Sequence, residues 1–290
     1  MRKRWKEAGL GLLNLLAVVL VIALVQPVLH KLLPRIVGAD NAEVGGAVVA
    51  LLCLCTYIAG VKWIERRTPT ELAADRALPE LAAGVGTGFV LFAAVMAILL
   101  LARVYHPAGW GSTSHLASGF LFALLAGILE EILFRGLLFR IASRIIGTWG
   151  ALFFTAALFG LAHSSNRGAT VSSSLAIALE AGILLGAAYA ATQRLWLPIG
   201  LHVGWNFTEG SVFGMSVSGN STVAGLLQGS LSGPRLLTGS AFGPEASIVA
   251  VIVCLVAALF FIRRTIKLDR IEPPMWSRPA ARLHVAVSGV

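Results

Sequence analysis

The sequence predicts an all-α polytopic membrane protein, folded as a bundle of about eight transmembrane helices. Of its 290 residues, 57% are hydrophobic and only 13% are charged, and the mean hydropathy is +0.83. Soluble domains contain roughly 45–50% apolar and about 25% charged residues. The composition therefore excludes a soluble globular domain, a disordered chain and a small disulfide-stapled protein.

A helix crosses the hydrocarbon core of a bilayer with about 20 consecutive apolar residues. Eight apolar runs approach or exceed this length, and the fifth and sixth are short. The runs lie at residues 8–29, 45–64, 81–102, 116–139, 149–163, 175–191, 195–213 and 246–262. They divide the chain into three predicted regions. Residues 1–110 hold three spans, residues 111–213 form a core of four spans, and residues 214–290 hold an external Gly/Ser-rich loop, the last span and a basic tail.

The distribution of basic residues supports the even number of spans. With the N-terminus inside, 18 of the 23 Lys and Arg residues fall on the cytoplasmic side. Membrane proteins concentrate Lys and Arg in their cytoplasmic segments. We therefore expect an integral, multi-pass membrane protein with both termini in the cytoplasm and the lipid bilayer as its first partner. Because this topology accounts for the net charge of +9, nucleic acid is not an expected partner.

Ionisable residues inside spans are candidates for function, since each costs free energy in a bilayer unless it is paired or hydrated. The fourth span contains Glu130, Glu131 and Arg135. Adjacent helix positions point about 100° apart, so the two carboxylates cannot face one partner. Arg135 follows Glu131 by four residues, which favours an ion pair and leaves Glu130 without a local partner. A Glu–Arg pair that only locks helices together is the structural alternative.

Three further places in the core carry polar groups. The fifth span ends in Phe159-Gly-Leu-Ala-His163, and the seventh contains His202 and Asn206 at i,i+4 spacing on one helix face. Each of these polar side chains, taken alone, could simply form a hydrogen bond between two helices. Glu180, in the sixth span, is expected to be interfacial or to pack between helices.

Counted at about 1.5 Å per residue, Glu131, His163, His202 and Asn206 fall in the inner half of the membrane. A carboxylate and an imidazole there could deprotonate a water, while His202 and Asn206 could donate hydrogen bonds to an oxyanion. Alternatively, Glu130, His163 and His202 could bind a zinc ion that activates the water. The sequence has neither a Gly-x-Ser-x-Gly elbow nor a His-Glu-x-x-His helix.

These motifs, Glu-Glu-x-x-x-Arg, Phe-x-x-x-His and His-x-x-x-Asn in this order, resemble the CPBP (Abi) intramembrane proteases over about residues 115–210. That family includes type II CAAX prenyl endopeptidases and bacteriocin-immunity proteins. The resemblance implies a catalytic Glu130 that works with His163 on water. It also implies that Glu131, Arg135 and Phe159 are supporting residues and that His202 and Asn206 lie on the oxyanion side. Both metal-dependent and metal-free members have been described, so zinc stays open.

The function that follows is an intramembrane endopeptidase of the CAAX-protease type. Its substrate would be a membrane-associated or prenylated peptide or protein, hydrolysed by a Glu/His-activated water. Two alternatives remain. One is a non-catalytic membrane protein for bacteriocin or toxin immunity or partner binding, and the other is a small transporter whose buried Glu and His relay protons.

Overall fold

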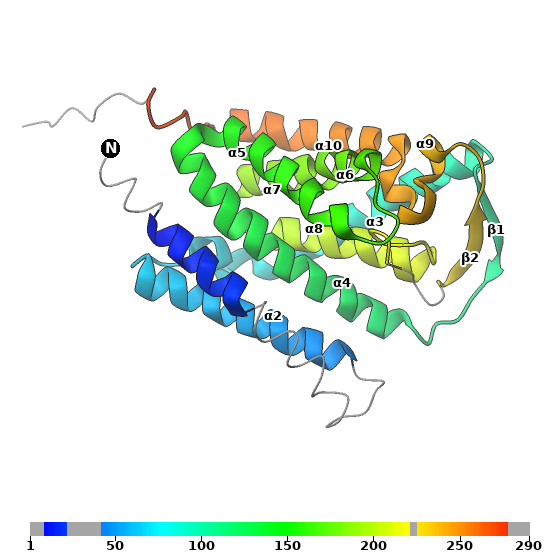
Figure 1. The fold of residues 1–290 in the computed structure, drawn as a ribbon, viewed down its shortest axis with the longest axis horizontal. Coiled ribbons are helices and arrows are strands. Elements are labelled where there is room, and N and C mark those ends of the chain that lie inside the picture. The colour runs from blue at the N-terminus through cyan, green and yellow to red at the C-terminus, as the bar shows by residue number, and fades with distance from the viewer. Residues whose placement is uncertain (1–8, 22–41, 221–224, 278–290) are drawn as a thin grey trace, which may run out of the picture.

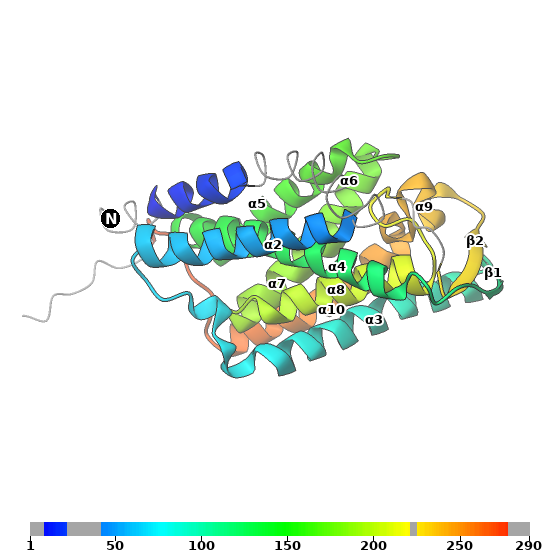
Figure 2. The ribbon, with the colours of Figure 1, turned by 90° about the horizontal axis from the view of Figure 1, so that it is seen from below.

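The computed structural model describes residues 9–21, 42–220 and 225–277, and these residues are mostly helical. The longer helices run lengthwise through the molecule, and a pair of short strands closes one end (Figure 1). The view from below shows that α3 and α10 lie on the side opposite to α2 (Figure 2). The helices of this bundle are α2 (Ala42–Ala59), α3 (Ala77–Leu101), α4 (Leu116–Glu131), α5 (Arg140–Ala162), α6 (Val171–Ile177), α7 (Ile183–Thr192), α8 (Trp196–Phe207), α9 (Arg235–Thr238) and α10 (Ile248–Lys267).

Four helices in the described part of the chain are long and apolar enough to cross a membrane. They are Thr70–Leu101, Leu116–Ser165, Val171–Thr192 and Ile248–Lys267. The expected first span lies partly outside the described residues, within which it forms a shorter apolar helix, Gly9–Val21. The described side chains of the expected second span form the shorter apolar helix Val48–Ile64, and the expected seventh span corresponds to α8 with the π-helical segment Thr208–Val212. The structure therefore supports the prediction of a multi-pass helical membrane protein. The number of eight spans and the orientation of the termini stay predictions.

The predicted fourth and fifth spans form one helical segment that bends sharply at Gly147. This residue has φ 77° and ψ 173°, outside the helical region. A Cβ at Gly147 would lie 2.7 Å from the carbonyl oxygen of Glu272. Glycine is required here because both the positive φ and the close approach of the chain after α10 exclude a side chain.

The described residues are mostly helical, as expected, and they also contain one two-stranded sheet that the sequence did not predict. Strands β1 (Tyr105–Trp110) and β2 (Leu227–Leu231) pair in antiparallel register, with Tyr105 opposite Leu231 and an irregularity between Pro107 and Gly109. The predicted Gly/Ser-rich loop supplies β2 and α9. Backbone hydrogen bonding between two distant loops, rather than a strongly apolar pattern, produces this sheet, and so sequence periodicity did not reveal it.

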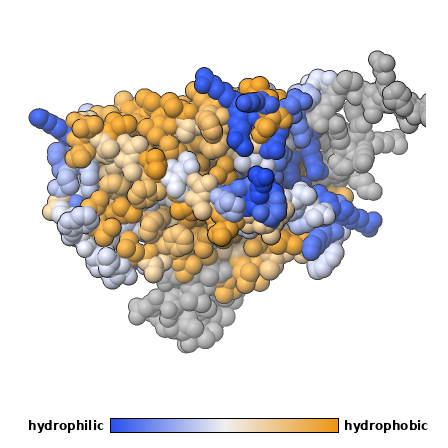
Figure 3. All heavy atoms as spheres, turned by 180° about the vertical axis from the view of Figure 1, so that it is seen from behind, coloured by the Kyte–Doolittle hydropathy of each residue, from blue (hydrophilic) through white to orange (hydrophobic). Residues whose placement is uncertain are grey.

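A broad apolar surface covers most of the face seen in Figure 3, and hydrophilic side chains gather toward the two ends. Many large apolar side chains on the helices are solvent-exposed in the isolated molecule, among them Val90, Phe153 and Val256, each about 62–63% exposed. In a bilayer such side chains face lipid tails, which accounts for their exposure.

Helices α3 and α8 approach each other through glycines on both sides. A Cβ added to Gly88 would lie 2.2 Å from the carbonyl oxygen of Leu201, and one added to Gly204 would lie 2.2 Å from that of Val85. Small residues allow such contact between membrane helices, where van der Waals packing drives association. Gly204 lies between His202 and Asn206, so this contact fixes the helix that carries two of the predicted site residues.

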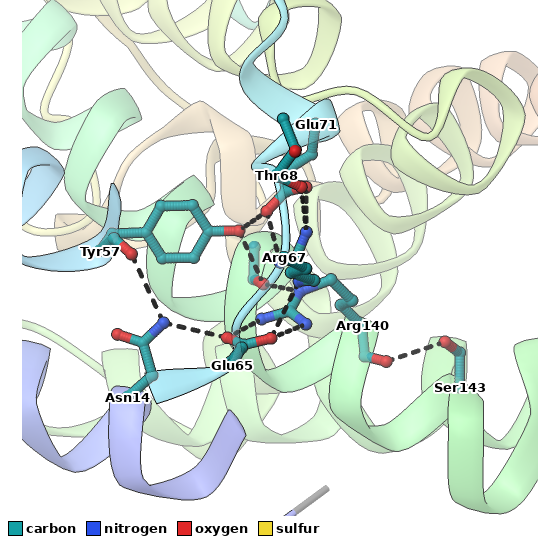
Figure 4. Close-up of polar contacts among 9 residues, drawn as sticks. Asn14, Tyr57, Glu65, Arg67, Thr68, Glu71, Arg140 and Ser143 are labelled. Atoms are coloured by element: carbon teal, nitrogen blue, oxygen red, sulfur yellow. Dashed lines mark hydrogen bonds and ion pairs between the residues drawn. The ribbon is translucent and has the colours of Figure 1, made fainter. Parts of the chain in front are cut away.

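A polar cluster joins the helix Gly9–Val21, the end of α2 and the start of α5 (Figure 4). Arg140 holds Glu65 through two hydrogen bonds of 2.6 and 2.7 Å, and Asn14 Nδ2 donates to Glu65 Oε1 at 3.0 Å. Arg140 Nε also donates to the carbonyl oxygen of Gly136. Gly136 follows Arg135 in the π-helical segment η4 (Ile132–Phe139), and the cluster therefore holds the segment next to the predicted site.

Replacement of Gly88 by valine should separate α3 from α8 and lower the unfolding free energy by about 2–3 kcal/mol, because the added atoms meet backbone rather than a movable side chain. Gly86→Val is the matched control, since a Cβ at Gly86 has nothing within 4 Å. Thermal unfolding in detergent measures both variants. Equal destabilisation of the two would show that helix propensity, not the α3–α8 contact, is responsible.

Glu65 should make stability depend on pH. Burial alone would raise the pKa of its carboxyl group, but hydrogen bonds and charge from Arg140, with further bonds from Asn14 and Arg67, lower the pKa from 4.5 to about 2. The stabilisation is therefore complete above about pH 4.5 and is lost as the pH falls toward 2. In acid titrations of stability, the difference between wild type and Glu65→Gln should shrink across this window. A constant difference would contradict the prediction.

Candidate active site

The two adjacent glutamates lie at the end of α4, where the helix changes to the π-helical segment η4. Glu131 is fully buried, whereas the side chain of Glu130 is 29% exposed. π-helical turns are frequent at functional sites because they alter the direction of side chains along a helix. Only Glu131 pairs with Arg135, but both carboxylates approach His202, so the expectation that they cannot face one partner is wrong.

Glu131 forms the buried ion pair predicted from its spacing with Arg135. Arg135 Nη1 donates to Glu131 Oε1 at 2.7 Å, and both side chains are at most 1% exposed. Arg135 Nη2 also donates to the carbonyl oxygens of Ala181 and Gly182, at 3.1 and 3.3 Å. The guanidinium lies 4.8 Å from the ring centroid of Phe159. Arg135 thereby ties α4 to α5 and to the π-helical segment η6 (Ala178–Gly182).

Both predicted histidines approach Glu130. His163 Nε2 lies 3.8 Å and His202 Nε2 lies 3.9 Å from the same oxygen, Glu130 Oε2. His163 Nδ1 is 2.8 Å from the carbonyl oxygen of Phe159, and His202 Nδ1 is 3.1 Å from Glu131 Oε1. Since a carbonyl and a carboxylate accept, each Nδ1 carries a proton, and each ring directs its Nε2 atom toward Glu130 Oε2.

The atom Glu130 Oε2 is buried, yet it has no hydrogen-bond partner among the described residues. Such an orphaned acceptor is costly unless a water or ligand pairs with it. Separations of 3.8 and 3.9 Å are too long for direct hydrogen bonds, and a water beside the oxygen can reach either imidazole. Glu130 Oε2 thus lies within 3.9 Å of the Nε2 atoms of both histidines.

A small cavity lies beside the two histidines. It offers about 20 Å³ to the centres of water molecules, room for about one water. Phe159, His163, His202 and Asn206 line it. The cavity thus brings together predicted residues from three segments, α5, the 3-10 turn His163–Ser165 and α8, whereas Glu130 lies outside its lining.

The predicted zinc ligands Glu130, His163 and His202 are spaced more widely than a zinc site requires. Zinc bonds of about 2.0–2.2 Å in a tetrahedron place ligand atoms about 3.4 Å apart. The distances from Glu130 Oε2 to the two Nε2 atoms are longer, and within the described residues no three His, Cys, Asp or Glu side chains form a group able to hold a metal ion. The donor types suit zinc, but their spacing does not fit it, and zinc stays a prediction.

Three carboxylates that the sequence did not single out as functional lie next to the site. Glu180 and Glu245 line the same cavity, and Glu245 N donates to Glu209 Oε1 at 3.4 Å. All three are at most 2% exposed. Of the two expectations for Glu180, its burial agrees with packing between helices rather than with an interfacial position. Helical periodicity could have identified Glu209 as a neighbour of the site, because it follows His202 by seven residues and lies on the same helix face. No local sequence pattern identifies Glu245.

The comparison with known families covers the same part of the chain. Residues 111–208 match the family model described as "Type II CAAX prenyl endopeptidase Rce1-like". No curated protein and no solved structure matches the chain. All residues of the three motifs, from Glu130 to Asn206, lie within the matched segment. The family resemblance predicted from the motifs is therefore confirmed: about a third of this chain, residues 111–208, matches the Rce1-like type II CAAX prenyl endopeptidases.

Proposed function

We propose that this protein is an intramembrane endopeptidase that hydrolyses a peptide bond of a membrane-associated substrate. The observation that carries the proposal is the position of Glu130 Oε2. This buried acceptor has no hydrogen-bond partner in the described part of the chain and faces the Nε2 atoms of His163 and His202. The match to a family of endopeptidases supports a peptidase at the coarse level.

In the proposed reaction, a water sits beside Glu130 and His163. Glu130 takes a proton from this water, and His163 Nε2 holds it in line for attack. The oxygen of the water forms a bond to the carbonyl carbon of the substrate. The C–N bond then breaks, and the proton taken by Glu130 passes to the departing amine. The products are a carboxylate and an amine.

The negative charge that develops on the carbonyl oxygen needs hydrogen-bond donors. The amide of Asn206 donates in every protonation state, and His202 donates through Nε2 when it carries a second proton. Glu131 supports His202, because its hydrogen bond to Nδ1 orients the ring. Arg135 in turn compensates the charge of Glu131, so both residues act by positioning.

The proposed substrates are CAAX-type tails or other membrane-bound peptides. The exposed apolar surface supports a substrate held in the bilayer. Zinc remains an alternative way to activate the water, and the spacing of the donors favours the metal-free route.

Glu130→Gln and His163→Ala should each reduce cleavage of a membrane-anchored reporter peptide about 10²–10⁴-fold, the contribution typical of acid–base catalysis. Purified protein in detergent is assayed with and without a chelator. His115→Ala is the matched control, because His115 is exposed and lies outside the cavity. Loss of activity on chelation, restored by zinc, would overturn the metal-free route. Folded variants as active as wild type would overturn the catalytic assignment.

Asn206→Ala should lower kcat about 10²–10³-fold with little change in KM, because the amide is proposed to bind the oxyanion more strongly than the substrate. Initial rates over a range of reporter concentrations separate the two parameters. Asn206→Asp tests the chemistry further, since it removes the donor but keeps the shape. A change confined to KM would assign Asn206 to substrate binding.

The two alternatives lead to different results in the same assay. Folded wild-type protein that cleaves nothing would favour a non-catalytic role in immunity or partner binding. A proton-coupled transporter is favoured by one observation, the three buried carboxylates beside the cavity. It predicts proton flux in sealed vesicles, reduced by Glu245→Gln, without any cleavage.

A further inference from the structure

A second and larger hollow opens on the outside of the bundle, between α6, α9 and the start of α10. Its volume is about 570 Å³, far larger than that of the cavity beside Glu130. We call it the α6–α10 groove. Its lining includes Leu175, Leu179, Leu236, Ile248, Val251 and Arg235.

Much of the groove is apolar and accessible. Leu175 is 58% exposed, Leu236 is 66% exposed and Ile248 is 36% exposed. Leu175 and Leu179 are one helical turn apart, so their side chains lie on one face of the α6–η6 helix. Val251 supplies the opposite wall from α10. The groove can therefore take a hydrocarbon chain along the direction of the helices.

The groove also has polar lining residues, and its charge has one sign. Arg235 is exposed at the first position of α9, and the exposed residues Ser172 and Ser240 carry hydroxyl groups. Among the described residues, no acidic side chain lines the groove and Arg235 forms no ion pair. A guanidinium beside hydroxyl groups suits a phosphate, which accepts several hydrogen bonds.

We propose that the α6–α10 groove binds an anionic phospholipid, with its phosphate at Arg235 and an acyl chain along Leu175, Leu179 and Val251. Charge complementarity selects this occupant, because a largely apolar groove lined by a cation that pairs with no described residue matches the two parts of such a lipid. The assignment does not depend on peptidase activity.

The groove lies directly behind the buried carboxylates. Leu179 and Ala246 line the groove. Their neighbours in the chain, Glu180 and Glu245, line the cavity. A bound lipid would therefore pack against the outer side of the two segments that carry Glu180 and Glu245.

Native mass spectrometry of the full-length protein in detergent tests this proposal. The protein is incubated with dioleoyl phosphatidylglycerol or with dioleoyl phosphatidylcholine, which differ only in the headgroup. Wild type should retain the anionic lipid preferentially. Arg235→Gln should reduce this retention about five-fold, the effect of one basic residue near an anionic membrane surface, and Arg235→Lys should keep most of it. Arg167→Gln is the matched control, because Arg167 is also exposed but does not line the groove.

Three results would overturn the proposal. Equal retention of the two lipids by wild type would mean that the groove holds bulk lipid without regard to charge. An equal loss in Arg167→Gln and Arg235→Gln would indicate a diffuse electrostatic effect. Unchanged preference in Arg235→Gln would place the phosphate elsewhere. Because retention is measured without substrate, a failure of the proposed peptidase activity leaves each of these results readable.

Discussion

The buried pair of Glu131 and Arg135 is the interaction on which the candidate site depends. Two charges removed from water are tolerated only when each is compensated. The arginine also satisfies carbonyl oxygens of Ala181 and Gly182 and covers the ring of Phe159, so one side chain joins three helical segments. Through Glu131 the pair orients His202. Removal of either charge would leave the other uncompensated and disturb the histidine as well.

The surrounding scaffold restricts the same residues from two sides. Glycines allow α3 to approach α8 at Gly204, between His202 and Asn206, and thereby fix the rotation of α8. At the other end of η4, Arg140 binds Gly136 and the carboxylate of Glu65. The site is consequently built on helices that have little freedom to shift. Such rigidity suits a reaction in which a water must be held within hydrogen-bonding distance of a base.

The local sequence predicted much of this arrangement. The four-residue spacing of Glu131 and Arg135 predicted a contact within one helix, and the geometry of a helix makes that contact independent of the rest of the fold. The position of His163 and His202 beside Glu130 followed only from family resemblance and approximate depth. The β1–β2 sheet was missed, because its pairing joins residues more than a hundred positions apart and has no strong alternating pattern.

By itself, the sequence determined that this protein is a multi-pass helical membrane protein with polar groups at defined places in its apolar helices, because composition and helical spacing are local properties. Only the tertiary structure decided that Glu130 Oε2 lies within 3.9 Å of two imidazoles and that Glu180 and Glu245 line one cavity with His163 and His202. Those contacts depend on the relative rotation and depth of separate helices. Close packing at glycines and the buried Arg135 determine that rotation and depth, and no single segment of the sequence contains this information.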